Sequence, residues 1–289
     1  MDPMISVVVL THNKAACTRR CLGSLLQTRY APWELVVVDN GSTDGTREWL
    51  ESFRGEADQA GVAVTLVFND GNIGCSTARN QGLARARGAH VAFLDNDVAL
   101  RKRNWLERLR AALDAQADAA MIGPKLVYPY PPYDIQCAGA AVSRGGRVQF
   151  MGRGESRDDP RFNRPRDVQC LISACCLARR DVLEQVGGFD EAFNPVEYED
   201  IDLCYKIRAQ GWRILYEPTV EMYHVESVTT AGTESLPNTY LIVKHGLEFK
   251  RRWRAMFERE DGPSDEETRW RRRPAVPFER IGKWPVFEE

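Results

Sequence analysis

The chain has 289 residues, of which 43% are hydrophobic, and this is enough for one large domain or two small ones with a proper core. Its 39 lysines and arginines against 41 aspartates and glutamates leave a formal charge of -2, so no nucleic acid is expected as a partner. The longest apolar runs, Ile5 to Leu10 and Leu171 to Ala178, are far shorter than the roughly 20 residues that a membrane span requires. We therefore expect a soluble, cytoplasmic protein that is at most peripheral at the inner face of a membrane.

The cysteines favour reduced thiols over disulfides or metal ligation. Most of the eight are in apolar stretches, and we recognise no secretory signal peptide. Cys17 with Cys21 and Cys175 with Cys176 are close in sequence, but no Cys-x-x-Cys pair occurs, so a structural zinc site is not expected.

Taken in chain order, the first half alternates between strand and helix patterns. The β-branched runs Met4 to Leu10 and Glu34 to Val38 lack polar alternation, which is typical of parallel strands covered on both faces. Between them, apolar residues from Cys17 to Leu26 fall at helical spacing. Further elements follow: a helix around 44–53, a strand at 62–68, a helix at about 76–87 and a strand that ends at Asp95. This alternation predicts an α/β fold with a doubly wound, mostly parallel sheet flanked by helices.

Polar clusters follow the successive strands, where ligands bind in sheets of this kind. The clusters are Thr11 to Asn13, Asp39 to Gly45, Asn69 to Gly74, and Asp95 to Asp97. Each alone is explained by an ordinary loop, but their common position at strand ends predicts one cleft along this edge of the sheet.

The last of these clusters has the pattern of a metal site. Asp95 and Asp97 are separated by one residue, so in an extended chain both side chains leave the same face and can converge on one cation. Mg²⁺ or Mn²⁺ held by one or two carboxylates keeps coordination positions open for a substrate diphosphate. A turn after a strand would explain the same residues.

The second half is less regular. Residues 124–168 are rich in Pro, Gly, Arg and Tyr, and we expect loops and short strands over the cleft. Regular structure is expected again at Gln169 to Ala178 and in a helix that starts near Glu199 and ends near Gly211. From about Leu247 the chain is strongly charged.

In the order and spacing of its motifs, the chain resembles the family 2 glycosyltransferases over roughly residues 4–245, in particular bacterial rhamnosyl- and hexosyltransferases of surface polysaccharide assembly. The motifs that carry this resemblance are Val7 to Asn13, Val36 to Gly45, Asn72 to Gly74, Ala78 to Gly82, Phe93 to Asp97, Gly187 to Asp190, and Glu199 to Leu203. The resemblance implies the GT-A fold, with a central sheet, flanking helices and a smaller acceptor-side region. It also implies that 1–123 bind the nucleotide-sugar donor and that 124–246 bind the acceptor and carry catalysis. The charge of 247–289, which lie beyond the resemblance, predicts a charged helix or tail.

The resemblance implies a donor-binding set of Thr11, Asn13, Asp39, Asn40, Asn72, Arg79, Asp95 and Asn96. Thr11 and Asp39 correspond to nucleobase contacts in the family. A carboxylate that accepts from an imide N–H, with Arg79 donating to a carbonyl, would favour a uracil or thymine nucleotide, hence a UDP- or dTDP-sugar.

The resemblance also implies a metal site for Mg²⁺ or Mn²⁺. Asp97 corresponds to the direct ligand of the cation that bridges both phosphates, and Asp95 to an aspartate near the ribose and the water on the cation. Asn96 is expected to point away from the cation as a spacer. His224 corresponds to the third ligand, although a lone histidine is more often structural.

For catalysis, the family pattern makes Asp200 the base that removes the proton of the acceptor hydroxyl in an inverting transfer. At the start of a helix, exposed N–H groups are expected to keep its carboxylate ionised. Glu199 would hold an acceptor hydroxyl or the backbone, and Asp202 would cap or pair. Ordinary enrichment of acids at a helix start would explain the same three residues. Where many relatives carry a Gly-Ala-small segment, this chain has Ser173 to Cys176, which leaves acceptor contacts there open.

Other α/β enzymes and a non-catalytic binding protein are the alternatives to a glycosyltransferase. No Gly-x-Gly-x-x-Gly or Gly-x-x-x-x-Gly-Lys-Ser/Thr occurs, which argues against a dehydrogenase and a P-loop enzyme. A sugar nucleotidyltransferase and a non-catalytic binder of sugar nucleotides stay open. The acceptor is expected to be a saccharide or a lipid-linked glycan. The tail, with Lys250 to Arg254 and Trp270 to Arg273, would either contact an anionic membrane or form a solvated helix with packed aromatic residues.

Overall fold

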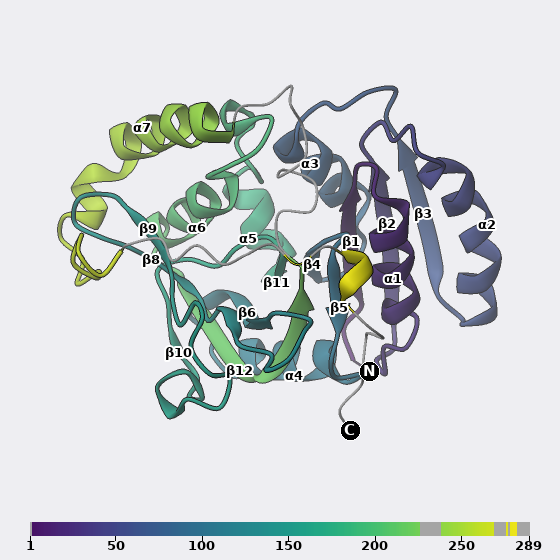
Figure 1. The fold of residues 1–289 in the computed structure, drawn as a ribbon, viewed down its shortest axis with the longest axis horizontal. Helices are drawn as coiled ribbons and strands as arrows, with labels where there is room; N and C mark the ends of the chain where they lie inside the picture. The colour runs from purple at the N-terminus through teal and green to yellow at the C-terminus, as the bar shows by residue number, and fades with distance from the viewer. Residues whose placement is uncertain (1, 226–237, 269–275, 277, 282–289) are drawn as a thin grey trace.

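Figure 1 shows the computed structural model of the chain, which describes residues 2–225, 238–268, 276 and 278–281. Its strands are β1 (Ile5–Thr11), β2 (Trp33–Asp39), β3 (Ala63–Phe68), β4 (His90–Asp95), β5 (Val98–Leu100), β6 (Ala119–Val127), β7 (Ile135–Cys137), β8 (Ala140–Val142), β9 (Val148–Phe150), β10 (Arg166–Asp167), β11 (Cys175–Arg179) and β12 (Arg213–His224). Its α-helices are α1 (Ala15–Leu25), α2 (Thr46–Gln59), α3 (Cys75–Arg85), α4 (Trp105–Asp114), α5 (Arg180–Gln185), α6 (Glu199–Ala209) and α7 (Asn238–Phe257).

Within the described residues, the main sheet has the strand order β10-β12-β6-β11-β4-β1-β2-β3, with β5 beside β12 and β7 beside β6. The part β3-β2-β1-β4 is entirely parallel, as the apolar runs predicted. β11 is antiparallel to both of its neighbours, β4 and β6, whereas β6 and β12 are parallel to each other. The predicted α/β fold with a large central sheet is confirmed, but the sheet as a whole is mixed, because β5, β7, β10 and β11 are antiparallel to their partners.

Helices cover both faces of this sheet because its strands bury side chains on both sides. On one face Val7 and Val9 pack with residues of α1, α2 and α4, such as Leu22 and Leu109. On the other face Val8 of the same strand packs with residues of α3, α5, α6 and α7. The alternation of side chains along β1 therefore divides the core into two halves.

The region 124–168 contains β7, β8, β9 and β10 with connecting loops, and β8 and β9 pair with each other. These short strands agree with the prediction, but β6 extends to Val127, so the expected division between residues 123 and 124 falls inside a buried strand. The expected division after residue 246 falls inside α7 in the same way.

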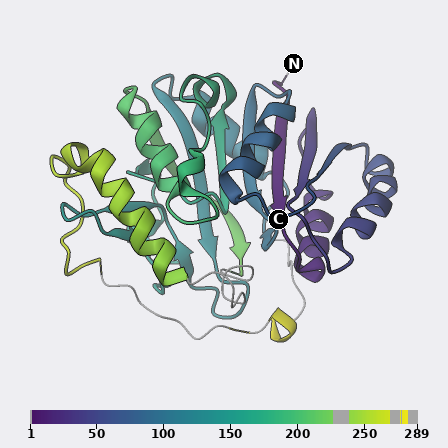
Figure 2. The same cartoon turned by 90° about the horizontal axis from the view of Figure 1, so that it is seen from above.

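α7 packs on α6 through Phe249, whose ring lies against Tyr205 at 5.0 Å between centroids. It lies at the outer edge of the molecule in both views (Figures 1 and 2). Trp270 to Arg273 of the expected tail lies outside the described residues.

All eight cysteines are among the described residues, and all are buried thiols outside any disulfide bond. This agrees with reduced thiols. Among the residues that the structure describes, no helix combines the length and the apolar character needed to cross a membrane.

Candidate active site

The carboxyl ends of the parallel strands bring the predicted polar loops to one edge of the sheet. Thr11 at the end of β1 is opposite Asp39 at the end of β2, and Leu10 is opposite Asp95 of β4. The loop after β3 joins them through Asn69, whose backbone N–H donates to the carbonyl of Asp39 at 2.9 Å. The side chains predicted from four separate segments are therefore neighbours in space.

Asp95, Asp97 and His224 form a compact group, in which one ligand atom from each residue lies within 4.8 Å of the others. Nε2 of His224 is 3.4 Å from Oδ1 of Asp97, and both side chains are buried. The cause is the pairing of β5 with β12, which places His224 opposite Val98, directly after Asp97. The N–H of Val225 also donates to the carbonyl of Asp97 at 3.2 Å.

This donor set fits a hard divalent cation. Two carboxylates supply the oxygens that Mg²⁺ and Mn²⁺ prefer, and a neutral imidazole adds a nitrogen ligand. Nδ1 of His224 lies 3.2 Å from Oε1 of Gln136, so a proton on Nδ1 leaves the lone pair of Nε2 facing Asp97. Gln136 was not predicted, because it belongs to the region 124–168, where no motif marks it.

Arg79 connects this group to the start of α6. Its Nη2 donates to Oδ1 of Asp95 at 2.7 Å and its Nη1 to Oε1 of Glu199 at 2.8 Å. The guanidinium is buried and also lies over the ring of Phe189. The expectation for Arg79 is a contact with a nucleobase carbonyl in the donor site. In the structure its hydrogen bonds go to two carboxylates instead.

Asp200 is the second residue of α6, as predicted, and its carboxylate accepts from the backbone N–H groups of Ile201 at 2.8 Å and Ser173 at 3.2 Å. Burial, with the nearby charge of Glu199, nevertheless raises the pKa of Asp200 to about 8. The expectation that the helix start keeps this carboxylate ionised is therefore wrong, since the desolvation outweighs the two hydrogen bonds. A carboxyl group with this pKa exchanges its proton near neutral pH.

The predicted donor-binding amides hold the loops to one another. Oδ1 of Asn13 accepts from the N–H of Thr43 at 2.7 Å, and Nδ2 of Asn40 donates to Oδ1 of Asn72 at 2.9 Å. The carboxylate of Asp39 is buried and accepts from the N–H of Ser42 at 3.3 Å. These contacts give the loops one defined arrangement at the strand ends.

Thr11 and Asn96 are both buried beneath this surface. Nδ2 of Asn96 donates to the hydroxyl groups of Thr11 at 3.0 Å and Thr18 at 2.9 Å. A nucleobase contact by the Thr11 hydroxyl would require an exchange of these bonds. Through these hydrogen bonds Asn96 holds the Asp95–Asp97 turn against β1 and α1.

Asp202 pairs, as expected. Its Oδ1 accepts from Nε1 of Trp253 at 2.8 Å and lies 3.4 Å from Nη1 of Arg252. Arg252 also bonds Asp190 at 2.6 Å. The residues Arg252 and Trp253 of the expected tail are thus part of the packing around α6, which favours the packed helix over the membrane tail for this segment.

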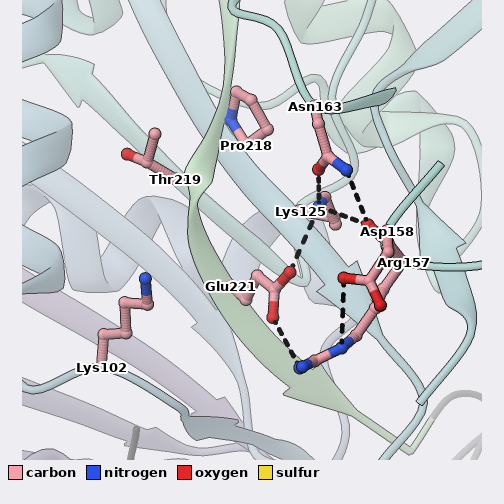
Figure 3. A pocket seen from close by; sticks show the side chains of 8 residues that line it. All are labelled: Lys102, Lys125, Arg157, Asp158, Asn163, Pro218, Thr219 and Glu221. Atoms are coloured by element: carbon pink, nitrogen blue, oxygen red, sulfur yellow. Dashed lines mark hydrogen bonds and ion pairs between the residues drawn. The ribbon is translucent and has the colours of Figure 1, made fainter. Parts of the chain in front are cut away.

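A separate polar hollow opens beside the middle of β12 (Figure 3). Its lining residues are Lys102, Lys125, Arg157, Asp158, Asn163, Pro218, Thr219 and Glu221. Glu221 accepts from Lys125 at 3.2 Å and from Arg157 at 3.3 Å, and Lys125 also bonds Asn163. None of the predicted site residues lines this hollow, and four of its charged residues, Lys125, Arg157, Asp158 and Glu221, pair among themselves.

Residues 6–187 match the family model described as "Glycosyl transferase family 2". The chain is 28% identical over 268 residues to N-acetylglucosaminyl-diphospho-decaprenol L-rhamnosyltransferase of Mycobacterium tuberculosis, covering 85% of this chain and 82% of that protein. It is 30% identical over 234 residues to O-antigen biosynthesis protein RfbC of Myxococcus xanthus, covering 78% of this chain but only 18% of the relative. It likewise spans only 28% of a related Sinorhizobium fredii protein.

Among solved structures, the mannosyltransferase PcManGT of Pyrobaculum calidifontis with GDP-Man and Mn²⁺ has a similar fold. Its TM-score is 0.58 at 20% identity, over 89% of this chain and 72% of that one.

Proposed function

Since the chain belongs to glycosyl transferase family 2, we propose that it transfers a sugar from a nucleotide-diphospho-sugar to a hydroxyl group of a saccharide or lipid-linked acceptor, with inversion and with a divalent cation. That the chain is a glycosyltransferase of the GT-A fold follows from the family and from its solved neighbours. The donor, the metal dependence, the stereochemistry and the residue roles are the proposal.

The grouping of Asp95, Asp97 and His224 is the observation that carries the proposal. In the proposed role, Asp97 and His224 are ligands of Mg²⁺ or Mn²⁺, and Asp95 is a ligand that Arg79 orients. When bound, the cation neutralises the negative charge that develops on the leaving diphosphate. The buried position of Asp97 and His224 strengthens their attraction for a cation, because little water screens it.

Asp200 is the proposed base. Its carboxylate is held at the start of α6 by two backbone N–H groups, and its pKa of about 8 allows it to accept a proton from a hydroxyl near neutral pH. Glu199 is the proposed positioning residue, since it binds Arg79 and lies next to Asp200. Arg79 therefore joins the metal-binding side of the site to the side of the base.

For the donor we propose UDP or dTDP, bound along Asn13, Asp39, Asn40 and Asn72, with Thr11 and Asn96 supporting this surface from beneath. Support comes from Asp39, a buried carboxylate at a strand end whose bonds to the N–H of Ser42 are long, which leaves it able to accept from a pyrimidine imide. One solved neighbour, GalNAc-T7, contains UDP and Mn²⁺, whereas PcManGT contains GDP-Man. The solved neighbours therefore do not identify the nucleobase of the donor, which binding measurements would determine.

For the acceptor, the relative from Mycobacterium tuberculosis carries a name that includes a lipid-linked glycan, N-acetylglucosaminyl-diphospho-decaprenol. We propose a saccharide or lipid-linked glycan for this chain as well, at the inner face of a membrane. A peripheral contact through residues 247–289 stays a prediction.

A screen of UDP-, dTDP- and GDP-sugars with and without Mn²⁺, read by thermal unfolding and by hydrolysis without acceptor, tests this function. We expect one donor to raise the melting temperature only with Mn²⁺ and to be hydrolysed slowly. Stabilisation with no hydrolysis would favour the non-catalytic binder. Release of pyrophosphate from a nucleoside triphosphate and a sugar phosphate would favour the nucleotidyltransferase.

A further inference from the structure

The first half of α7 exposes an apolar surface that the proposed transfer does not explain. Of the five large hydrophobic side chains that are exposed among the described residues, four are on this helix: Tyr240, Ile242, Val243 and Leu247. Tyr240, Val243 and Leu247 are spaced by three and four residues, so they share one face of the helix. Val243 is 56% exposed and Leu247 is 65% exposed. Exposed apolar side chains that share one face, rather than lying singly over the surface, are typical of an interaction site.

The opposite face of the same turns packs next to the site. Nδ1 of His245 lies 2.9 Å from the carbonyl oxygen of Val196 and 3.1 Å from that of Glu197. These two residues directly precede Tyr198, the N-cap of α6, and Asp200 follows two positions later. One helix therefore separates the apolar surface from the segment that leads to the proposed base.

The charge of this surface is positive. The stretch from Tyr240 to Leu247 contains no carboxylate, and Lys244 is exposed on the same face as Val243 and Leu247. Further along this face the side chains of Arg251 and Arg254 are 70% and 67% exposed, and each forms an ion pair with a glutamate, Arg251 with Glu248 at 2.6 Å and Arg254 with Glu258 at 3.6 Å. Apolar side chains with a tyrosine and cations beside them are typical of helices that lie in the interface of an anionic bilayer.

A second copy of the chain fits this surface less well. Two turns of helix extend over only about 12 Å, whereas a stable dimer usually buries about 800 Å² on each partner. A lipid surface requires no such area, because each inserted side chain contributes separately.

We propose that the face of α7 formed by Tyr240, Val243, Lys244 and Leu247 docks on a membrane that contains anionic phospholipid. This docking rests on the proposed function, because it assumes that the acceptor of the transfer is carried by a lipid. A docked α7 would hold the segment 196–200 about one helix diameter, roughly 10 Å, from the bilayer. The acceptor hydroxyl of a lipid-linked glycan could then approach Asp200 from the membrane side.

Sedimentation of the full chain with vesicles tests the docking. We expect the chain to sediment with phosphatidylcholine vesicles that contain phosphatidylglycerol, and less with phosphatidylcholine alone or at high salt. The double substitution V243S/L247S should weaken vesicle binding by about tenfold or more. The control A255S changes an exposed residue later on the same helix and should bind like the parent chain.

Failure of the parent chain to bind, or equal binding by V243S/L247S, would overturn the docking. A dimer in sedimentation equilibrium that V243S/L247S dissociates, without vesicle binding, would overturn it in favour of a second copy. Donor hydrolysis without acceptor, measured in parallel, separates the two proposals. Vesicle binding by a chain that hydrolyses no donor would overturn the transfer and support the docking alone.

Discussion

Nη1 of Arg79 donates to Oε1 of Glu199 at 2.8 Å, and this bond joins α3 to the first residue of α6. The other amino group of the same guanidinium binds Asp95, one of the three residues of the metal group. One planar, buried side chain thus links Glu199, the neighbour of the proposed base, to Asp95, one of the proposed metal ligands.

The first prediction concerns this bridge. Arg79→Lys keeps the positive charge but loses the fork that holds two carboxylates in fixed directions. We expect kcat to fall about 100-fold, because small displacements of catalytic groups have large effects on rate. The affinity for the donor nucleotide should change much less. Steady-state kinetics would show this division.

Arg87→Lys is the matched control, since Arg87 pairs with Glu34 at the opposite end of the sheet and is largely exposed. It should leave kcat unchanged. A wild-type kcat in Arg79→Lys would contradict the bridging role.

The second prediction concerns Asp200. Asp200→Asn should retain donor binding in a thermal shift assay but lose transfer by about 100-fold to 10,000-fold, the usual contribution of a general base. Turnover close to that of the parent chain would remove Asp200 from the mechanism.

The pH dependence follows from the same residue. Because the base acts when it is deprotonated, kcat/KM should rise with pH and level off above about pH 8. The native pKa is raised above the unfolded value near 3.9, so the native state holds the extra proton between about pH 4 and pH 8. Stability should therefore fall as the pH rises through this window. Asp200→Asn should melt about 2–4 °C higher than the parent chain at pH 8, which a pair of melting curves would test.

The third prediction concerns the metal group. Asp97→Asn and His224→Gln should each weaken Mn²⁺ binding at least about tenfold in titration calorimetry, and Gln136→Leu should weaken it less because Gln136 acts through His224. His90→Gln is the control. His90 lies at the start of β4, whereas Asp95 lies at its end, and the side chain of His90 pairs with Asp114. Unchanged Mn²⁺ affinity in Asp97→Asn would exclude this residue as a ligand.

The half of the site that the sequence predicts best is built on local patterns. Asp39 and Asp95 end apolar runs, and parallel pairing alone brings such ends together. The contact of His224 with Asp97 depends on β5, a three-residue strand that pairs with β12. Nothing local in Val98–Leu100 indicates a partner 122 to 126 residues away, so only the family resemblance pointed to His224.

Strand order and burial explain the other differences. The position of antiparallel β11 between β4 and β6 is a matter of topology, which apolar periodicity does not encode. The sequence does not predict the raised pKa of Asp200. The helix start is visible in the sequence, whereas the surroundings that desolvate the carboxylate come from distant segments. The bond between Asp202 and Trp253 joins residues 51 positions apart for the same reason.

The fourth prediction uses this bond. Trp253→Phe leaves the ring packing largely intact but removes the N–H that Oδ1 of the buried Asp202 accepts from. We expect a loss of about 1–3 kcal/mol in the free energy of unfolding by urea, because a buried carboxylate loses a hydrogen bond. Arg254→Ala, at an exposed position of the same helix, should stay within about 0.5 kcal/mol of the parent chain. Equal stabilities would show that α7 contributes little through Asp202.

The fifth prediction compares two glycines of the loop after β2. Gly41 and Gly45 both have positive φ angles, 80° and 84°, so a side chain is strained at either position. They differ in how much room a side chain would have. A Cβ atom at Gly41 would lie 2.5 Å from backbone atoms of Gly71, whereas a Cβ at Gly45 would meet nothing within 4 Å. Gly45→Ala should therefore lower stability by about 1 kcal/mol through backbone strain alone, with donor affinity preserved.

Gly41→Ala must in addition push apart the loops after β2 and β3, which Asn40 and Asn72 hold together at 2.9 Å. Because Asp39, Asn40 and Asn72, three of the proposed donor contacts, lie at or in these loops, we expect donor affinity to fall about tenfold or more beyond any effect of Gly45→Ala, a difference of about 1.4 kcal/mol in binding free energy. Calorimetric titration of both variants with the donor that the nucleotide screen identifies would measure it. Equal affinities in the two variants would show that the donor does not depend on the close approach of the two loops, and the proposed contacts of Asn40 and Asn72 would then have to be abandoned.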